Sequence, residues 1–176
     1  MSWKSNTGHI CKKITSGLGA LRRVREFVDK DALLAIYNAL VQPYFNYCCE
    51  VWDVFGATQS TRLQKLHNKA ARILGNMNND VDHKIALNAL GWQPLQMQRK
   101  KSKAKIMFKV LNNMGPKGLT KYFTYKKEKS DYNLRNISNA VCLPKPRTNN
   151  MKKSFIYMEL FAHRNYGEQD PVIFQT

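Results

Sequence analysis

The sequence predicts a mainly α-helical protein, an irregular bundle of about five helices followed by an extended, loop-rich carboxyl-terminal segment. Apolar residues recur at three- and four-residue steps through the first two thirds of the chain, and residues that start or stop helices separate the periodic segments. Beyond residue 131 this periodicity disappears, and Asn and Pro become frequent. We therefore expect a helical module over residues 1–115, a loop-rich segment over 116–157 and a divergent, disordered tail over 158–176.

The first predicted helix covers residues 7–28, where Ile10, Ile14 and Leu21 lie on one face. Gly17 and Gly19 fall inside it. A glycine within a helix costs about 1 kcal/mol relative to alanine, because its backbone loses more freedom. The pair therefore indicates either a close contact between helices or a kink.

The most apolar stretch covers residues 32–52 and is expected to form the centre of the core. Its side chains recur at helical spacing, and the other positions are hardly more polar, which predicts a helix buried on nearly all sides. Asp29 is suited to cap its amino-terminal end. Pro43 lacks a backbone donor, so we expect a break near residues 41–44. One predicted face consists of Leu33, Tyr37, Leu40, Tyr44, Tyr47, Cys48 and Val51.

Residues 61–74 give the clearest amphipathic pattern, and Gly75 is a natural stop. Four cations step by three, four and three residues and so project from one narrow face. Like charges at this spacing repel each other by a few tenths of a kcal/mol per pair, a cost that an anionic partner would remove. These candidate nucleic-acid-binding residues are Arg62, Lys65, Lys69 and Arg72.

Two further helices are expected, a short one over residues 83–90 capped by Asp82 and a long one over residues 95–113. The long helix contains the basic run RKKSKAK, in which some cations form one stripe and others spread around the helix. A short helical turn is expected near residues 119–123 and a short strand near 140–143. The candidate phosphate-binding residues of the long helix are Arg99, Lys100, Lys101, Lys103, Lys105 and Lys109.

The net charge is the strongest global signal. The chain has 29 Lys and Arg residues against 12 acids, a formal charge of +17. Residues 61–130 carry sixteen of the bases and three of the acids, so most of the excess belongs to one region. Such a concentration predicts a polyanionic partner, although a solvated helix face remains the alternative for each basic stripe.

Cysteine and histidine usage predicts no zinc site, because the four Cys and four His residues show no metal-binding spacing. The polar residues within 32–52 argue against membrane insertion. Without a signal peptide, an intracellular location, nuclear or cytoplasmic, is expected. His67 and the Asp82–His83 pair are expected to be structural rather than catalytic. Trp92, Tyr122, Tyr125 and Tyr132 could stack on bases, but core or rim positions are commoner for such aromatics.

A series of motifs resembles the segment that follows the palm in reverse transcriptases of non-LTR (LINE-like) retrotransposons. The motifs are SWKSNTGHI, GLGALRRVR, LAIYNALVQPYFNYC and LQKLHNKAARIL, followed by LGWQPL, DYNLR, LPKPRTN and KKSFIY. They cover about residues 1–157. The resemblance implies a thumb-side helical module that, in the parent polymerase, would hold template and primer near the palm.

The departures from the family pattern decide the expected activity. The parent enzyme would use Mg²⁺ held by a YxDD-type motif and a third carboxylate. This sequence has no such motif, and palm, fingers and endonuclease are missing. After Tyr157 the chain also leaves the family pattern. We therefore expect a fragment of an RNA-directed DNA polymerase that is not an enzyme as it stands and that has no cofactor and no small-molecule substrate.

The expected residual activity is sequence-independent binding to the phosphate backbone of RNA or DNA. A missing palm and fingers region is the second expected partner. The alternative is a decayed transposon reading frame without selected activity, whose apolar surface once packed on that palm. A third interpretation, binding of the basic helix to anionic membrane, lacks the bulky aromatic face that such helices carry.

Overall fold

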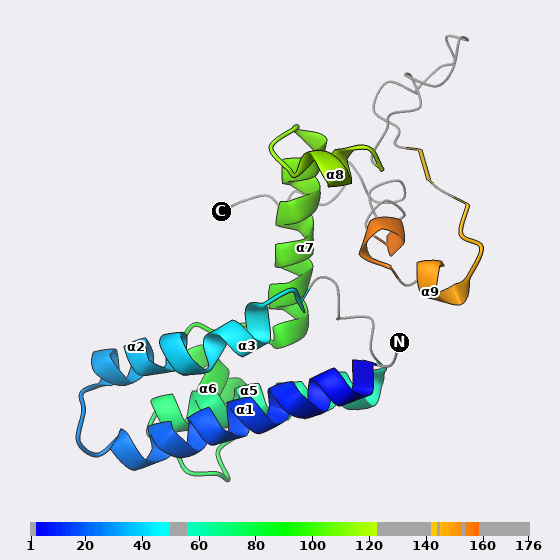
Figure 1. The fold of residues 1–176 in the computed structure, drawn as a ribbon. Helices are drawn as coiled ribbons and strands as arrows, with labels where there is room; N and C mark the ends of the chain where they lie inside the picture. The colour runs from blue at the N-terminus through cyan, green and yellow to red at the C-terminus, as the bar shows by residue number, and fades with distance from the viewer. Residues whose placement is uncertain (1–2, 50–55, 123–141, 144, 153, 159–176) are drawn as a thin grey trace, which may run out of the picture. The chain divides into compact units, whose positions relative to one another are not determined.

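The computed structural model describes residues 3–49, 56–122, 142–143, 145–152 and 154–158 (Figure 1). Helices are the regular elements of these ranges, which confirms the mainly α class. The chain divides into two compact units, residues 1–99 and residues 100–176, and each is described by itself. The predicted division into a helical module over 1–115, a loop-rich segment over 116–157 and a tail over 158–176 stays a prediction.

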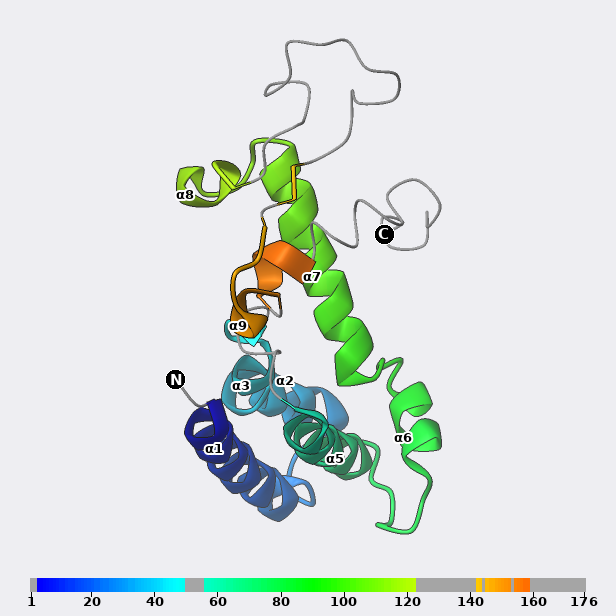
Figure 2. The same cartoon turned by 90° about the vertical axis from the view of Figure 1, so that its right-hand side faces the viewer.

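Unit 1 is built from helices that pack around α5 (Ala57–Leu74). Helix α1 (Trp3–Val24) contacts α5 along its length, and α6 (His83–Ala89) contacts α5 from another side (Figure 2). The pair α2 (Lys30–Leu40) and α3 (Gln42–Asn46) also packs on α1, and α7 (Leu95–Leu111) begins in this unit. Their shared core includes Ile14, Leu18, Leu21, Leu33, Tyr37, Val41, Phe45, Leu63 and Ala70.

Local signals place the start of α2 and the break after it as predicted. The Asp29 carboxylate accepts a hydrogen bond from the backbone N–H of Ala32 at 2.9 Å, which satisfies one donor of the first turn. The break between α2 and α3 falls at Val41, two residues before Pro43. The expectation of a split helix is therefore confirmed.

The prediction that residues 32–52 are buried on nearly all sides was wrong for the described part of this stretch. Val41, Phe45 and Cys49 are buried, whereas Tyr47 is 78% exposed and Leu40 is 49% exposed. The buried positions keep a four-residue step through Leu33, Tyr37, Val41, Phe45 and Cys49, so the core face differs from the predicted one after Tyr37. α2 and α3 consequently bury one side only.

Gly17 is the point of close approach between α1 and α2. A Cβ atom at Gly17 would lie 2.8 Å from Cγ2 of the fully buried Val41, whereas one at Gly19 would meet nothing within 4 Å. Of the two interpretations, close contact and kink, the first applies to Gly17. A close contact does not explain Gly19. The backbone freedom that Gly19 loses on folding is not offset by tighter packing of the helices.

Replacing the two glycines with alanine should shift stability in opposite directions. Gly19→Ala should stabilise by up to about 1 kcal/mol through helix propensity. Gly17→Ala gains the same helix propensity but forces α1 away from Val41. We therefore expect the free energy of unfolding to fall by about 1–3 kcal/mol. Urea unfolding of the two variants checks this, and equal stabilisation by both would show that the α1–α2 contact is wrong.

The remaining helices of unit 1 follow the predicted signals closely. α5 begins four residues earlier than predicted and ends at Leu74, with Gly75 following. Asp82 caps α6, since its carboxylate accepts from the backbone N–H of Lys84 at 3.2 Å. α7 starts at Leu95 as expected and ends two residues early.

Unit 2 has a small core around the second half of α7. Met107 and Val110 are buried there, and the residues packed on them include Leu119, Leu143, Phe155 and Ile156. The predicted turn near residues 119–123 corresponds to α8 (Lys117–Thr120). The carboxyl-terminal segment was expected to be extended, but it contains α9 (Asn149–Lys152), whose residue Met151 donates its backbone N–H to Thr148 Oγ1 at 3.2 Å.

Some predictions concern residues that the structure leaves undescribed. Residues 140 and 141 of the predicted strand and residues 159–176 of the predicted tail lie outside the described ranges. Among the helices that are described, none combines the length and the apolar character needed to cross a bilayer.

Candidate nucleic-acid interface

A groove of about 970 Å³ runs along the outer face of α5 in unit 1. Side chains of α1, α5, α6 and the first turn of α7, together with two connecting segments, line it. Among the described residues that line it, five are cations and none is an acid, so this part of the groove is an electropositive concavity. The lining residues are Arg22, Ser60, Thr61, Gln64, Lys65, Asn68, Lys69, Arg72, Asn79, His83, Lys84, Leu87, Pro94 and Gln96.

Helix α5 supplies the floor of the groove because its two faces differ. Leu63, Ala70 and Leu74 are buried in the core, whereas Lys65 and Lys69 are exposed on the opposite side. The three- and four-residue spacing that predicted one narrow cationic face therefore brings Lys65, Lys69 and Arg72 together in the groove.

Arg62, the fourth predicted cation of α5, is exposed but does not line the groove. It lies near Cys11 of α1: burial raises the pKa of the Cys11 thiol, and the Arg62 charge opposes that rise. Arg62 therefore faces the α1 side of the helix. We keep it as a peripheral cation of the candidate interface.

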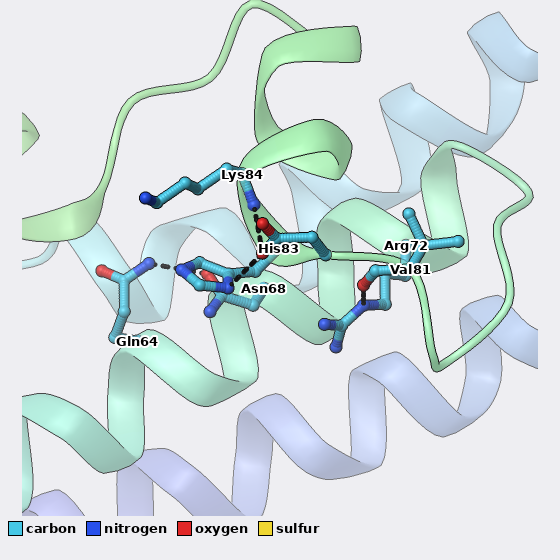
Figure 3. Close-up of polar contacts among 7 residues, drawn as sticks. Gln64, Asn68, Arg72, Val81, His83 and Lys84 are labelled. Atoms are coloured by element: carbon cyan, nitrogen blue, oxygen red, sulfur yellow. Dashed lines mark hydrogen bonds and ion pairs between the residues drawn. The ribbon is translucent and has the colours of Figure 1, made fainter.

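Arg72 also has a structural contact within the groove. Its Nε donates to the backbone carbonyl of Val81 at 2.9 Å (Figure 3). This bond ties the end of α5 to the segment that leads into α6. Arg72 can still present charge to a ligand, but its replacement would also loosen that segment.

Sequence reasoning missed two cations of the groove, Arg22 and Lys84. Arg22 lies in the last turn of α1, and Lys84 lies in the first turn of α6. Neither belongs to a basic stripe of its own helix that the sequence analysis singled out. Only the packing of α1 and α6 against α5 brings these residues to the cationic face of α5.

A chain of amide hydrogen bonds orders one part of the groove. The backbone N–H of Leu95 donates to Gln64 Oε1 at 2.9 Å, and Gln64 Nε2 donates to Asn68 Oδ1 at 2.8 Å. Figure 3 shows Gln64 and Asn68 on α5 near Lys84 and His83 at the start of α6. Gln64 thus joins the start of α7 to α5 and fixes the Asn68 amide.

Asp82 and His83 stand at the start of α6 and form an ion-pair contact of 2.8 Å between Oδ1 and Nδ1. Asp82 also caps the helix, so its carboxylate is engaged in local structure. Both side chains thus have local structural contacts at the start of α6, and their structural interpretation stays a prediction.

The cations of α7 do not all face solvent. In unit 2, Lys100, Lys105 and Lys109 are exposed, and Lys101 and Lys103 are partly exposed. Arg99, by contrast, lies in unit 1 and is only 2% exposed. We remove Arg99 from the candidate interface, because a buried guanidinium cannot meet a phosphate in this conformation. The reason is that the first turns of α7 pack on unit 1 through Leu95.

His67 lies in an aromatic cluster beneath the groove floor. Its ring is stacked on Trp92 at a centroid distance of 5.1 Å and meets Phe45 edge-on at 5.5 Å. Burial, together with the nearby charge of Arg99, lowers the pKa of His67 to about 4. The side chain is therefore neutral at pH 7, and the prediction of a structural role agrees with this placement.

The aromatics considered for base stacking fall into three groups. Trp92 packs on Tyr37 at 4.9 Å as well as on His67, so it belongs to the core. Tyr122 is exposed, and the Lys121 ammonium lies 5.2 Å from its ring centroid. Tyr125 and Tyr132 lie outside the described residues.

Within the described ranges, no group of three or more His, Cys, Asp or Glu side chains is placed to hold a metal ion.

Comparison with known proteins yields no significant match to a family model, to a curated protein or to a solved structure. The resemblance to reverse transcriptases of non-LTR retrotransposons thus rests on the spaced motifs alone and remains a hypothesis.

Proposed function

We propose that this chain is a helical module derived from the reverse transcriptase of a non-LTR retrotransposon, and that it binds the phosphate backbone of RNA or DNA without base specificity. In this proposal the chain does not polymerise by itself and needs no cofactor. A palm and fingers region of such a polymerase is its proposed protein partner.

The observation that supports nucleic-acid binding most is the groove on α5, whose described lining residues carry cations and no carboxylate. Arg22, Lys65, Lys69, Arg72 and Lys84 converge there from three helices. Phosphate binding releases condensed counterions, and this release favours dense cations at a concave surface. A solvated face of one helix explains a basic stripe, but it does not explain convergence from three.

The length of the groove floor suits a polyanion better than a single phosphate group. Ser60 and Arg72 both line the groove. The twelve helical steps that separate them span about 18 Å. At about 3.4 Å per nucleotide of a stacked strand, this length corresponds to about five phosphates. The exposed lysines of α7 add a second basic surface in unit 2.

One observation favours the alternative of a decayed reading frame without selected activity. Leu40 and Tyr44 leave part of their apolar surface exposed on α2 and α3, and Phe27 is 86% exposed. An apolar surface of this kind promotes association. In that case the isolated chain should aggregate or bind a hydrophobic dye, whereas a cooperative melt of a monomer would count against it.

The direct test is binding of a labelled RNA and a labelled DNA of unrelated sequence to the full chain. Binding should occur at low ionic strength, weaken steeply with added salt and differ little between sequences. At the same low salt, the triple variant Lys101→Gln, Lys105→Gln, Lys109→Gln should bind the labelled nucleic acids more weakly than the parent chain. Binding that is absent at low salt, or insensitive to salt, would refute the proposal. Vesicles with and without acidic lipid test the membrane alternative in parallel.

A further inference from the structure

We infer that the groove on α5 accepts a single-stranded nucleic acid, with its phosphates on the groove floor, in preference to a duplex. This inference rests on the proposed function and names the class of nucleic acid that the groove takes. It comes from the arrangement of the charges around the concavity.

The cations of the groove stand on its floor and on both sides. Lys65 and Lys69 rise from α5, which forms the floor. Arg22 comes from α1 and Lys84 from α6, the two helices that flank α5 (Figure 2). A backbone lying along α5 would therefore meet positive charge on three sides, and charges on several sides of a concavity reinforce each other's field.

We expect a flexible strand to meet more of these charges at once than a duplex does. A duplex is a stiff rod over this length and holds its phosphates at fixed positions on its outer surface. A single strand is flexible enough to follow the floor and to place successive phosphates beside Lys65, Lys69 and Arg72. These three residues span about 10 Å along the helix.

The hydrogen-bonded side chains of Gln64 and Asn68 add a donor of fixed orientation beside the lysines of the groove. Since Asn68 Oδ1 accepts from Gln64, the Asn68 Nδ2 atom is left to donate into the groove that this residue lines. The bond from Leu95 N–H to Gln64 holds the chain in place. A donor whose orientation is already fixed loses little entropy when a phosphate oxygen binds.

The lining residues that the structure describes include no Phe, Tyr or Trp. Stacking on aromatic side chains is the usual way in which single-strand-binding proteins hold bases. The groove therefore contacts the backbone and leaves the bases turned outward. It should accept any sequence, and RNA as well as DNA.

The experiment compares a labelled single strand of about 15 nucleotides, longer than the groove floor, with a blunt duplex of the same sequence. The full chain is used at low salt. We expect the single strand to bind at least about tenfold more tightly than the duplex. The variant Lys65→Gln, Lys69→Gln should weaken single-strand binding about tenfold and remove the preference.

The matched control is Lys12→Gln with Lys13→Gln, which removes the same charge from exposed positions of α1 outside the groove lining. This variant should retain the preference for the single strand. Both substitutions keep a good helix former, so circular dichroism melts should agree with the parent chain.

The outcomes separate this inference from the proposed function. Equal or tighter binding of the duplex overturns the single-strand inference and leaves nucleic-acid binding standing. A preference that survives in the Lys65→Gln, Lys69→Gln variant also overturns it, because the groove would not be its source. If neither nucleic acid binds at low salt, the proposed function itself falls.

Discussion

Replacing Phe45 with alanine should destabilise unit 1 by about 3–5 kcal/mol. The Phe45 side chain is 1% exposed, packs in the main core and meets the His67 ring edge-on. Its removal leaves a cavity between α3 and α5 that the neighbouring helices cannot fill without moving. The loss is measurable by chemical unfolding of unit 1, followed through its buried aromatics.

Tyr44 is the matched control for this prediction. It precedes Phe45 in the same short helix and is 36% exposed. Tyr44→Ala should cost about 1 kcal/mol or less. If Tyr44→Ala is the more damaging change, the sequence-based face through Leu40, Tyr44 and Tyr47 is correct and the described packing of α3 is not.

Acidification should weaken the fold through His67. The pKa of this side chain is about 4 in the folded chain, against 6.5 for an unperturbed histidine. Because the folded pKa is lowered, the unfolded state binds the proton more readily between pH 6.5 and pH 4. Stability is therefore complete above pH 6.5 and falls as the pH drops towards 4, by about 2–3 kcal/mol at pH 4.5.

Two measurements isolate this contribution of His67. The variant His67→Phe cannot be protonated at this position, so its unfolding free energy should change less between pH 7 and pH 4.5 than that of the parent chain. An NMR titration of the His67 ring protons should show no transition near neutral pH. A titration midpoint near 6.5 would contradict the buried, neutral histidine beside Trp92.

Elements with a local chemical cause could be predicted from the sequence. Asp29 and Asp82 cap helices because a short carboxylate reaches the free backbone donors of the first turn. Pro43 interrupts the central stretch because it lacks a donor. Helical spacing also predicts that Lys65, Lys69 and Arg72 share one face of α5, although it wrongly adds Arg62 to that face. Each of these signals acts within one turn and does not depend on the rest of the fold.

Features that depend on packing between helices could not be predicted in this way. The face of α3 that is buried, with Phe45 in the core, depends on how α2 and α3 both pack on α1. Arg99 belongs to a run of basic residues, yet its helix begins within unit 1 and the side chain is buried. Arg22 and Lys84 join the groove only through tertiary contacts.

The proposal that the α5 groove binds phosphates is tested most directly by the salt dependence of single-strand affinity. The logarithm of the binding constant should fall linearly with the logarithm of salt concentration, and each phosphate contact contributes about −0.7 to the slope. The five groove cations alone predict a slope of about −3.5, which is a loss of about 100-fold between about 50 and 200 mM salt.

The comparison of the parent chain with Lys65→Gln, Lys69→Gln decides whether the groove is the source of that slope. Two lost phosphate contacts should make the slope less steep by about 1.4, while Lys12→Gln, Lys13→Gln should leave it unchanged. Identical slopes for the parent chain and the groove variant would contradict phosphate binding in the α5 groove.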